Sequence, residues 1–225
     1  MVLVTHSYGS VEATNLIKSQ LTQHRICSMV LIDPMTFLLH HPDVAHNFTA
    51  RKPVRANEHQ LTYFARMDTG VAHTPGRRFF RTENIIWVEE LGLGAPNGVR
   101  CVTIVMGGQD LIINTRNVSE YLLASTNVPL NDTTHTEPLA GGHATGNKNK
   151  PAKAARVKLL DLRSSKDYFG AKLPIKTKEE WKSGPWKQCG LNVLWFEHLD
   201  HAQVFDKARS RSIVAQAIRR YSTNC

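Results

Sequence analysis

Residues 1–10 read MVLVTHSYGS, and this stretch decides the fold that we predict. The apolar and β-branched residues Val2–Thr5 are typical of a buried strand, and a helix-period pattern begins directly afterwards at Val11. The strand therefore delivers Ser7 at a sharp turn into a helix. A serine becomes nucleophilic only when a base takes its proton, so its hydroxyl must stand where an imidazole reaches it. Ser7 is the candidate nucleophile, and the alternative interpretation is an ordinary helix N-cap.

A second strand with a functional residue at its end is expected at residues 99–106. This run is apolar almost throughout, and Gly107 and Gly108 let the chain turn tightly before Asp110. Open α/β sheets place functional groups at the carboxyl ends of their strands, so Asp110 is a candidate acid. The alternative is an Asp in a turn or at the N-cap of a helix over 118–124.

Two further strands complete the predicted sheet. Ser28–Ile32 is largely apolar and closes with an Asp-Pro turn, as a fully buried parallel strand does. Leu191–Phe196 is the last strand. It is followed by a loop with two histidines, His198 and His201, and by an amphipathic helix over Asp206–Tyr221. The spacing of strands and helices indicates βαβ units with right-handed crossovers.

The turn at Ser7 and the two later sites resemble the α/β-hydrolase fold family. The signature of that family is a strand, a nucleophile turn and a helix, with Ser, Asp and His in that order along the chain. The turn matches the G-x-S-x-G pattern at Gly9 and departs from it at Thr5. Residues 107–110, GGQD, match the strand-Gly-x-x-Asp context of the family's acid.

The resemblance implies a serine hydrolase with a catalytic triad. Ser7 would be the nucleophile, Asp110 the acid and His201 the base. His201 fits the family's pattern better than His198, because a small residue follows it and it lies farther from the strand. The backbone N–H of Tyr8 would be one oxyanion donor. The implied activity is that of a carboxylesterase or lipase-like enzyme, which cleaves a carboxylic ester or lipid-like acyl substrate with no cofactor and no metal.

The predicted fold class is α/β, a partial α/β-hydrolase fold with about four mostly parallel strands, flanking helices and a helical cap. Only six residues precede Ser7, whereas the family has several strands there and the loop that gives the second oxyanion donor. The chain thus resembles the C-terminal half of such an enzyme. The nucleophile strand would form an exposed edge. Three interpretations follow: a truncated gene product or incomplete gene model, which we favour, a chain whose edge a second copy or a partner chain covers, or an inactive remnant. The alternative function is a truncated or noncatalytic α/β-hydrolase-like protein with a binding role.

The expected organisation is a single α/β-hydrolase-like domain over 1–225 that lacks the N-terminal part of the fold. A helical cap or lid is expected over 37–98, with apolar residues at helical spacing in 61–65 and 79–87. The alternative is a helical subdomain packed for stability alone. A basic, partly disordered insert is expected over 127–188. The net charge of +9 concentrates there, since residues 134–189 hold 12 Lys or Arg against 5 Asp or Glu. Because the basic residues gather in one insert, nucleic-acid binding is not favoured.

The four cysteines have no paired spacing, which predicts buried reduced thiols rather than disulfides or a zinc site. The longest apolar runs fall well short of the roughly 20 residues that cross a bilayer, so no transmembrane segment is expected. The start of the sequence has no secretory signal pattern. These observations predict a cytoplasmic location.

Overall fold

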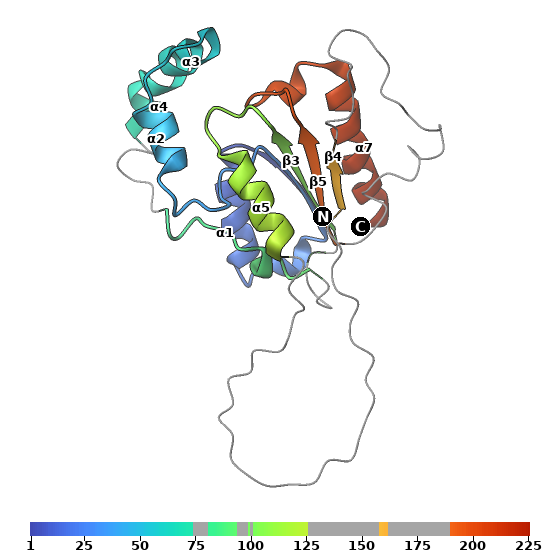
Figure 1. Cartoon of the computed structure of the whole chain (residues 1–225). Coiled ribbons are helices and arrows are strands. Elements are labelled where there is room, and N and C mark those ends of the chain that lie inside the picture. The colour runs from blue at the N-terminus through green and yellow to red at the C-terminus, as the bar shows by residue number, and fades with distance from the viewer. Residues whose placement is uncertain (74–80, 94–98, 100, 126–157, 162–189) are drawn as a thin grey trace, which may run out of the picture.

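One parallel sheet forms the centre of the molecule. The computed structural model describes residues 1–73, 81–93, 99, 101–125, 158–161 and 190–225. Five strands pair side by side in the order β1-β2-β3-β5-β4, and every pair is parallel (Figure 1). Their bounds are β1 Val2–His6, β2 Ser28–Ile32, β3 Cys101–Gly107, β4 Lys158–Asp161 and β5 Gly190–Phe196. The predicted α/β fold class is confirmed.

The sheet has one strand more than the four that the sequence predicts. β4 lies within the basic segment 127–188 and pairs with β5, from Lys158 opposite Asn192 to Asp161 opposite Trp195. Apart from β4, the predicted basic, partly disordered insert over 127–188 lies outside the described residues. β1 occupies the other edge of the sheet, as predicted, and Val4 on it is 40% exposed.

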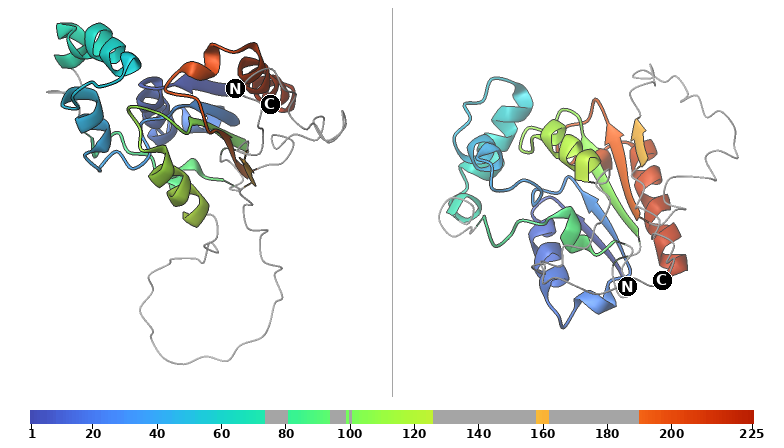
Figure 2. Two further views of the ribbon diagram at one scale, coloured as in Figure 1. Left: turned by 45° about the horizontal axis from the view of Figure 1, so that its top comes forward. Right: turned by 60° about the horizontal axis from the view of Figure 1, so that its bottom comes forward.

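Helices cover both faces of the sheet (Figure 2). α1 (Gly9–Lys18) and α5 (Thr115–Ser125) lie on one face, and α7 (Ala208–Asn224) lies on the other. β2 and β3 are buried along their whole length, which explains why both read as continuous apolar runs in the sequence. Successive side chains of β2 and β3 point to opposite faces of the sheet. They therefore pack into two separate cores, one under each helical layer.

The core on the α7 face is built around Tyr221, which is fully buried. Its hydroxyl lies 2.6 Å from Oγ1 of Thr103 and accepts a hydrogen bond from Nδ2 of Asn192 at 3.3 Å. These bonds give three buried polar side chains a partner, which offsets the cost of burying the polar residues of β3 and β5. The apolar neighbours in this core include Val30, Ile32, Val105, Leu194, Ile213, Val214 and Ala217.

A group of short helices follows β2 and stands apart from the sheet at its carboxyl edge (Figure 1). They are α2 (Asp43–Thr49), α3 (Ala56–Leu61), the π-helical turn η2 (Thr62–Arg66) and α4 (Thr69–His73). The guanidinium of Arg66 donates hydrogen bonds to the carbonyls of Asn47, Phe48 and Arg51, and so fixes η2 to the end of α2. Helices in this region agree with the prediction for 61–65.

The predicted helical segment over 79–87 is wrong in its described part. Residues 81–87 form a turn and an extended stretch, and the next element is the 3-10 helix η4 (Val88–Leu91). Ile85 and Ile86 are buried in the core, and the N–H of Ile86 donates to the carbonyl of Thr36. Burial of two adjacent apolar residues outweighs the helical spacing that the sequence suggested.

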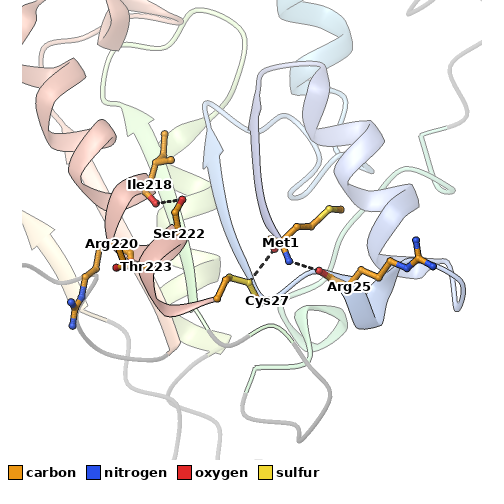
Figure 3. The surroundings of a disulfide bond; sticks show 8 residues. Met1, Arg25, Cys27, Ile218, Arg220, Ser222 and Thr223 are labelled. Atoms are coloured by element: carbon orange, nitrogen blue, oxygen red, sulfur yellow. Dashed lines mark hydrogen bonds between the residues drawn. A yellow bond between two sulfur atoms is a disulfide. The ribbon is translucent and has the colours of Figure 1, made fainter.

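A disulfide joins Cys27, just before β2, to Cys225 after α7, with a Cα–Cα distance of 6.0 Å. Figure 3 shows Cys27 next to Met1 and close to the end of α7. The expectation of reduced thiols is therefore wrong for this pair. Cys101 is buried in β3, as predicted, and Cys189 lies outside the described residues. The two partners lie 198 residues apart, so only the tertiary fold brings them together.

None of the helices in the described parts of the chain is long and apolar enough to cross a membrane.

Candidate active site

The turn after β1 presents Ser7 in a strained backbone conformation. Its φ is 50°, in the left-handed region that residues with a side chain rarely adopt. The N–H of Ser7 donates to the carbonyl of Ile32 at 2.9 Å, and the hydroxyl of Ser10 donates to the carbonyl of Ser7 at 2.6 Å. Hydrogen bonds thus hold the turn on both sides, and strain of this kind is typical of functional sites.

The departure from G-x-S-x-G at Thr5 has a local structural explanation. A Cβ built on Gly9 would lie 3.5 Å from the Cβ of Thr5, which is an ordinary van der Waals contact. The strand and the helix therefore leave room for a Cβ at position 9 beside the side chain of Thr5. Close packing at this crossing does not require glycine at position 5.

Gly107 and Gly108 precede Asp110 at the end of β3. The sequence predicts that they allow a tight turn, but the structure shows that they allow a close contact between two backbone segments. A Cβ on Gly107 would overlap the carbonyl oxygen of Leu199, and one on Gly108 would overlap that of Glu197. The N–H of Gly108 donates to the carbonyl of Phe196 at 2.9 Å. The two glycines thus allow the end of β3 to touch the loop that carries His201, and this close approach positions Asp110.

Both oxygens of Asp110 are engaged, and its side chain is completely buried. Oδ1 accepts hydrogen bonds from the N–H groups of Ile112 and Ile113, both at 2.8 Å. Oδ2 lies 2.8 Å from Nδ1 of His201. The backbone bonds orient the carboxylate, so its second oxygen faces the imidazole.

His201 lies between the other two predicted site residues. Its Nδ1 faces Asp110, and its Nε2 is 2.7 Å from Oγ of Ser7. A carboxylate only accepts hydrogen bonds, so Nδ1 carries the proton in the neutral imidazole and Nε2 accepts from the Ser7 hydroxyl. The structure thus brings Ser7, Asp110 and His201 into one hydrogen-bonded chain across 194 residues of sequence separation.

The pKa of His201 is raised from its ordinary value. Burial alone disfavours the charged ring, but the hydrogen bond and charge of Asp110 outweigh it, and the charges of Asp33 and Asp200 add to them. The site therefore stabilises an imidazolium, the species that forms when His201 accepts a proton.

Asp200 links the loop of His201 to its surroundings. Its Oδ1 accepts from the N–H of His201 at 2.7 Å and from the N–H of Leu111 at 2.9 Å. Its Oδ2 accepts from Nδ2 of Asn57 on α3 at 2.7 Å. One carboxylate thus connects the His201 loop, the Asp110 loop and the short helices.

Tyr8 begins the helix that follows the nucleophile turn. It is the N-cap residue of α1, whose first turn leaves backbone N–H groups directed away from the helix. Its peptide N–H adjoins Ser7, at the helix end where the dipole favours negative charge. The side chain of Tyr8 is 41% exposed and lines a cavity beside Ser7.

The cavity has a volume of about 350 Å³ and a largely apolar wall. Ser7 lies in its wall, so the cavity opens onto the candidate nucleophile. Residues of α2, η2 and α4 contribute Val44, Ala45, Phe48, Ala65 and Val71 to the lining. Arg81 brings a positive charge to it. The volume lies at the small end of the range for ligand pockets.

Asp33, Asp110 and His201 each have one donor atom within 4.8 Å of the others, a grouping that metal sites also show. Here the same atoms are used in hydrogen bonds. Asp110 and His201 share one bond, and Asp33 Oδ2 accepts from the N–H of Ala202 at 2.9 Å. We assign no metal to this group because hydrogen bonding already accounts for its geometry.

The sequence interpretation missed Asp33, which it treated only as part of an Asp-Pro turn. Its position after a buried strand is the same signal that identified Asp110. It also missed His6, whose ring lies 5.4 Å from that of His201. The Nε2 atom of His6 is buried without a hydrogen-bond partner among the described residues and lies 3.7 Å from Oδ2 of Asp33.

The chain has a weak structural similarity to one known protein and no detectable sequence similarity to a described family. No family model matches the sequence, and no curated protein matches it. Among solved structures, the chain is similar to an esterase of Pyrococcus furiosus, with 11% identity and a TM-score of 0.43. The match covers 98% of this chain and 53% of the esterase, so the chain spans about half the length of that protein. No function is transferred from a similarity of this size.

Proposed function

We propose that this chain is a serine hydrolase that acts on a carboxylic ester or a lipid-like acyl substrate. The observation that carries the proposal is the position of His201, which hydrogen bonds to Ser7 at 2.7 Å and to Asp110 at 2.8 Å. A nucleophile, a base and a group that orients the base are the minimum set for acyl transfer through a serine. The α/β fold of the chain supports the same class of enzyme.

In the proposed reaction, Oγ of Ser7 attacks the acyl carbonyl carbon while Nε2 of His201 takes the hydroxyl proton. Asp110 holds Nδ1–H and stabilises the resulting imidazolium. The backbone N–H of Tyr8 donates to the oxyanion of the tetrahedral intermediate. The C–O bond to the leaving group then breaks, and that oxygen takes the proton from His201. Water attacks the acyl-enzyme in the same way and releases the acid.

The apolar cavity supports an acyl group as the part of the substrate that binds beside Ser7. We propose that residues 37–98 act as a cap, since α2, η2 and α4 form much of the cavity wall. A volume of about 350 Å³ favours a short or medium acyl group over a long chain. Transfer of that group from water contributes roughly 0.8 kcal/mol per buried methylene.

Hydrolysis of p-nitrophenyl esters tests the proposal. We expect a burst of p-nitrophenol followed by slower turnover in the wild type, and neither in Ser7→Ala. A binding protein without catalysis, the alternative function, would give no burst although the ester still occupies the cavity. Retention of activity in Ser7→Ala would also contradict the proposal.

The predicted cytoplasmic location remains to be tested together with the disulfide. Disulfides persist in oxidising compartments and are rare in the cytosol. Mass spectrometry of the protein from its native cells, after alkylation without reduction, shows whether Cys27 and Cys225 are joined. Free thiols at both positions would support the cytoplasm, and a bridged pair would contradict it.

A further inference from the structure

We propose that Asp33 is a positioning residue of this site, whose carboxylate holds the His201 loop and stabilises the imidazolium that forms when Ser7 loses its proton. The inference rests on the proposed function and adds a fourth residue to the three that the sequence identifies. Asp33 would act through His201 without touching the substrate.

The backbone around Asp33 is built like the backbone around Ser7. Asp33 directly follows β2, has a φ of 45° and is 1% exposed. Its N–H donates to the carbonyl of Val105 on the neighbouring strand at 2.8 Å. Ser7, Asp33 and Ala202 are three of the non-glycine residues with positive φ, and they meet at this site. Strained conformations that gather in one place are typical of functional sites.

The carboxylate of Asp33 is hydrogen bonded to the loop at the residue that follows His201. Its Oδ2 accepts a hydrogen bond from the N–H of Ala202 at 2.9 Å, and Ala202 is the residue that follows His201. Ala202 has a φ of 65°, so this bond holds a strained peptide. Two carboxylates therefore orient His201. Asp110 bonds to its ring, and Asp33 bonds to the backbone N–H of the next residue, Ala202.

The charges around His201 come from the ends of three strands and from its own loop. Asp110 follows β3, Asp33 follows β2, Asp200 precedes His201, and His6 ends β1. Burial raises the pKa of Asp33 to about 6, although His201 and the N–H groups of Ala202 and Gly107 act in the opposite direction. Burial and the charge of His201 lower the pKa of His6. The pKa of His6 is thus lowered while that of His201 is raised, and the three carboxylates favour the charged form of His201 against its burial.

A structural role alone would not require the charge. An Asn at position 33 has a side-chain oxygen that accepts the same hydrogen bond from Ala202, so Asp33→Asn keeps the bond to the His201 loop and removes the charge. Because Asp33 is not among the residues that line the cavity, the substitution should leave substrate binding unchanged. The charge is therefore separable from both packing and binding.

The test measures the titration of His201 by NMR of protein labelled with ¹³C-histidine, with the signal assigned by its absence in His201→Gln. In Asp33→Asn, we expect the pKa of His201 to fall. The exposed Asp206 supplies the matched control, since Asp206→Asn removes a surface carboxylate near the same loop and should leave the titration unchanged. An unchanged His201 pKa in Asp33→Asn would overturn the inference.

Kinetics give a second readout that a purely structural role would not produce. In Asp33→Asn, the acid limb of the kcat/KM profile should move to lower pH, because the imidazole loses its proton more easily. At the plateau, kcat should fall about tenfold to a hundredfold with KM unchanged, as for loss of a charged partner. A matching rise in KM, or an acid limb that stays in place, would contradict the inference.

Two further outcomes separate this inference from the proposed function. If the wild type hydrolyses no ester and yet the pKa of His201 falls in Asp33→Asn, the proposed function fails and the electrostatic role of Asp33 stands. If Asp33→Asn does not fold, the carboxyl ¹³C signal of Asp33 is followed in the wild type. Its titration should be accompanied by a shift of the His201 signal, and independent titrations would overturn the inference.

Discussion

Replacement of Asp110 by Asn isolates the role of one carboxylate oxygen. The Asn side-chain oxygen still accepts from the N–H groups of Ile112 and Ile113, which both lie 2.8 Å from Oδ1 of Asp110. The amide NH₂ then faces Nδ1 of His201 in place of Oδ2. Two donors cannot share one bond, so the imidazole moves its proton to Nε2. Nε2–H then faces Ser7 and no longer accepts the hydroxyl proton.

The expected loss follows from that change of tautomer. The same substitution in a serine protease triad lowers kcat by about 10⁴, which corresponds to about 5.5 kcal/mol in the activation free energy. We expect a loss of this order in the rate at which a fluorophosphonate modifies Ser7 in Asp110→Asn. Circular dichroism checks that the fold is retained, and Asp206→Asn serves as the control. A loss smaller than about tenfold in a folded variant would refute the assignment of Asp110.

Three other perturbations test separate parts of the structure. The Cys27→Ser, Cys225→Ser double variant should lose about 5 kcal/mol of unfolding free energy in urea, by the chain-entropy model for partners 198 residues apart; no loss would contradict the disulfide. Because the pKa of Asp33 is raised to about 6 in the folded state, its contribution to stability should fall by about 3 kcal/mol as pH rises from 4 to above 6. Asp33→Asn should abolish this loss of stability with rising pH. An identical pH dependence of stability in both proteins would contradict the raised pKa of Asp33. Ala45→Leu narrows the cavity and should lower kcat/KM for hexanoate esters about tenfold while acetate esters change less than twofold; equal effects on both would argue against an acyl site there.

Where a strand pattern led directly to a candidate site residue, the sequence predicted which side chains lie close together. Ser7 and Asp110 both follow apolar runs that became β1 and β3, and parallel strands bring their carboxyl ends to one edge of a sheet. His201 was chosen by its order and by the small residue after it. The structure places all three within hydrogen-bond distance, and their catalytic roles remain the proposal that the experiments test.

The features that the sequence did not predict depend on contacts between distant segments. β4 is only four residues long and lies in a basic segment, so its two leucines gave too short a pattern to identify a strand. The two cysteines of the disulfide meet because the start of β2 and the end of α7 lie at the same end of the sheet. The proposed role of Asp33 depends on its contact with the loop of Ala202, which lies 169 residues away in the sequence.

The most direct test of the central claim is to map the residue that a fluorophosphonate modifies. Peptide mass spectrometry of the treated full-length chain should find the adduct on Ser7, with labelling abolished in Ser7→Ala and strongly slowed in His201→Gln. Absence of an adduct on Ser7 in the folded wild type, or labelling at an unchanged rate in His201→Gln, would contradict the assignment of this site as a serine hydrolase.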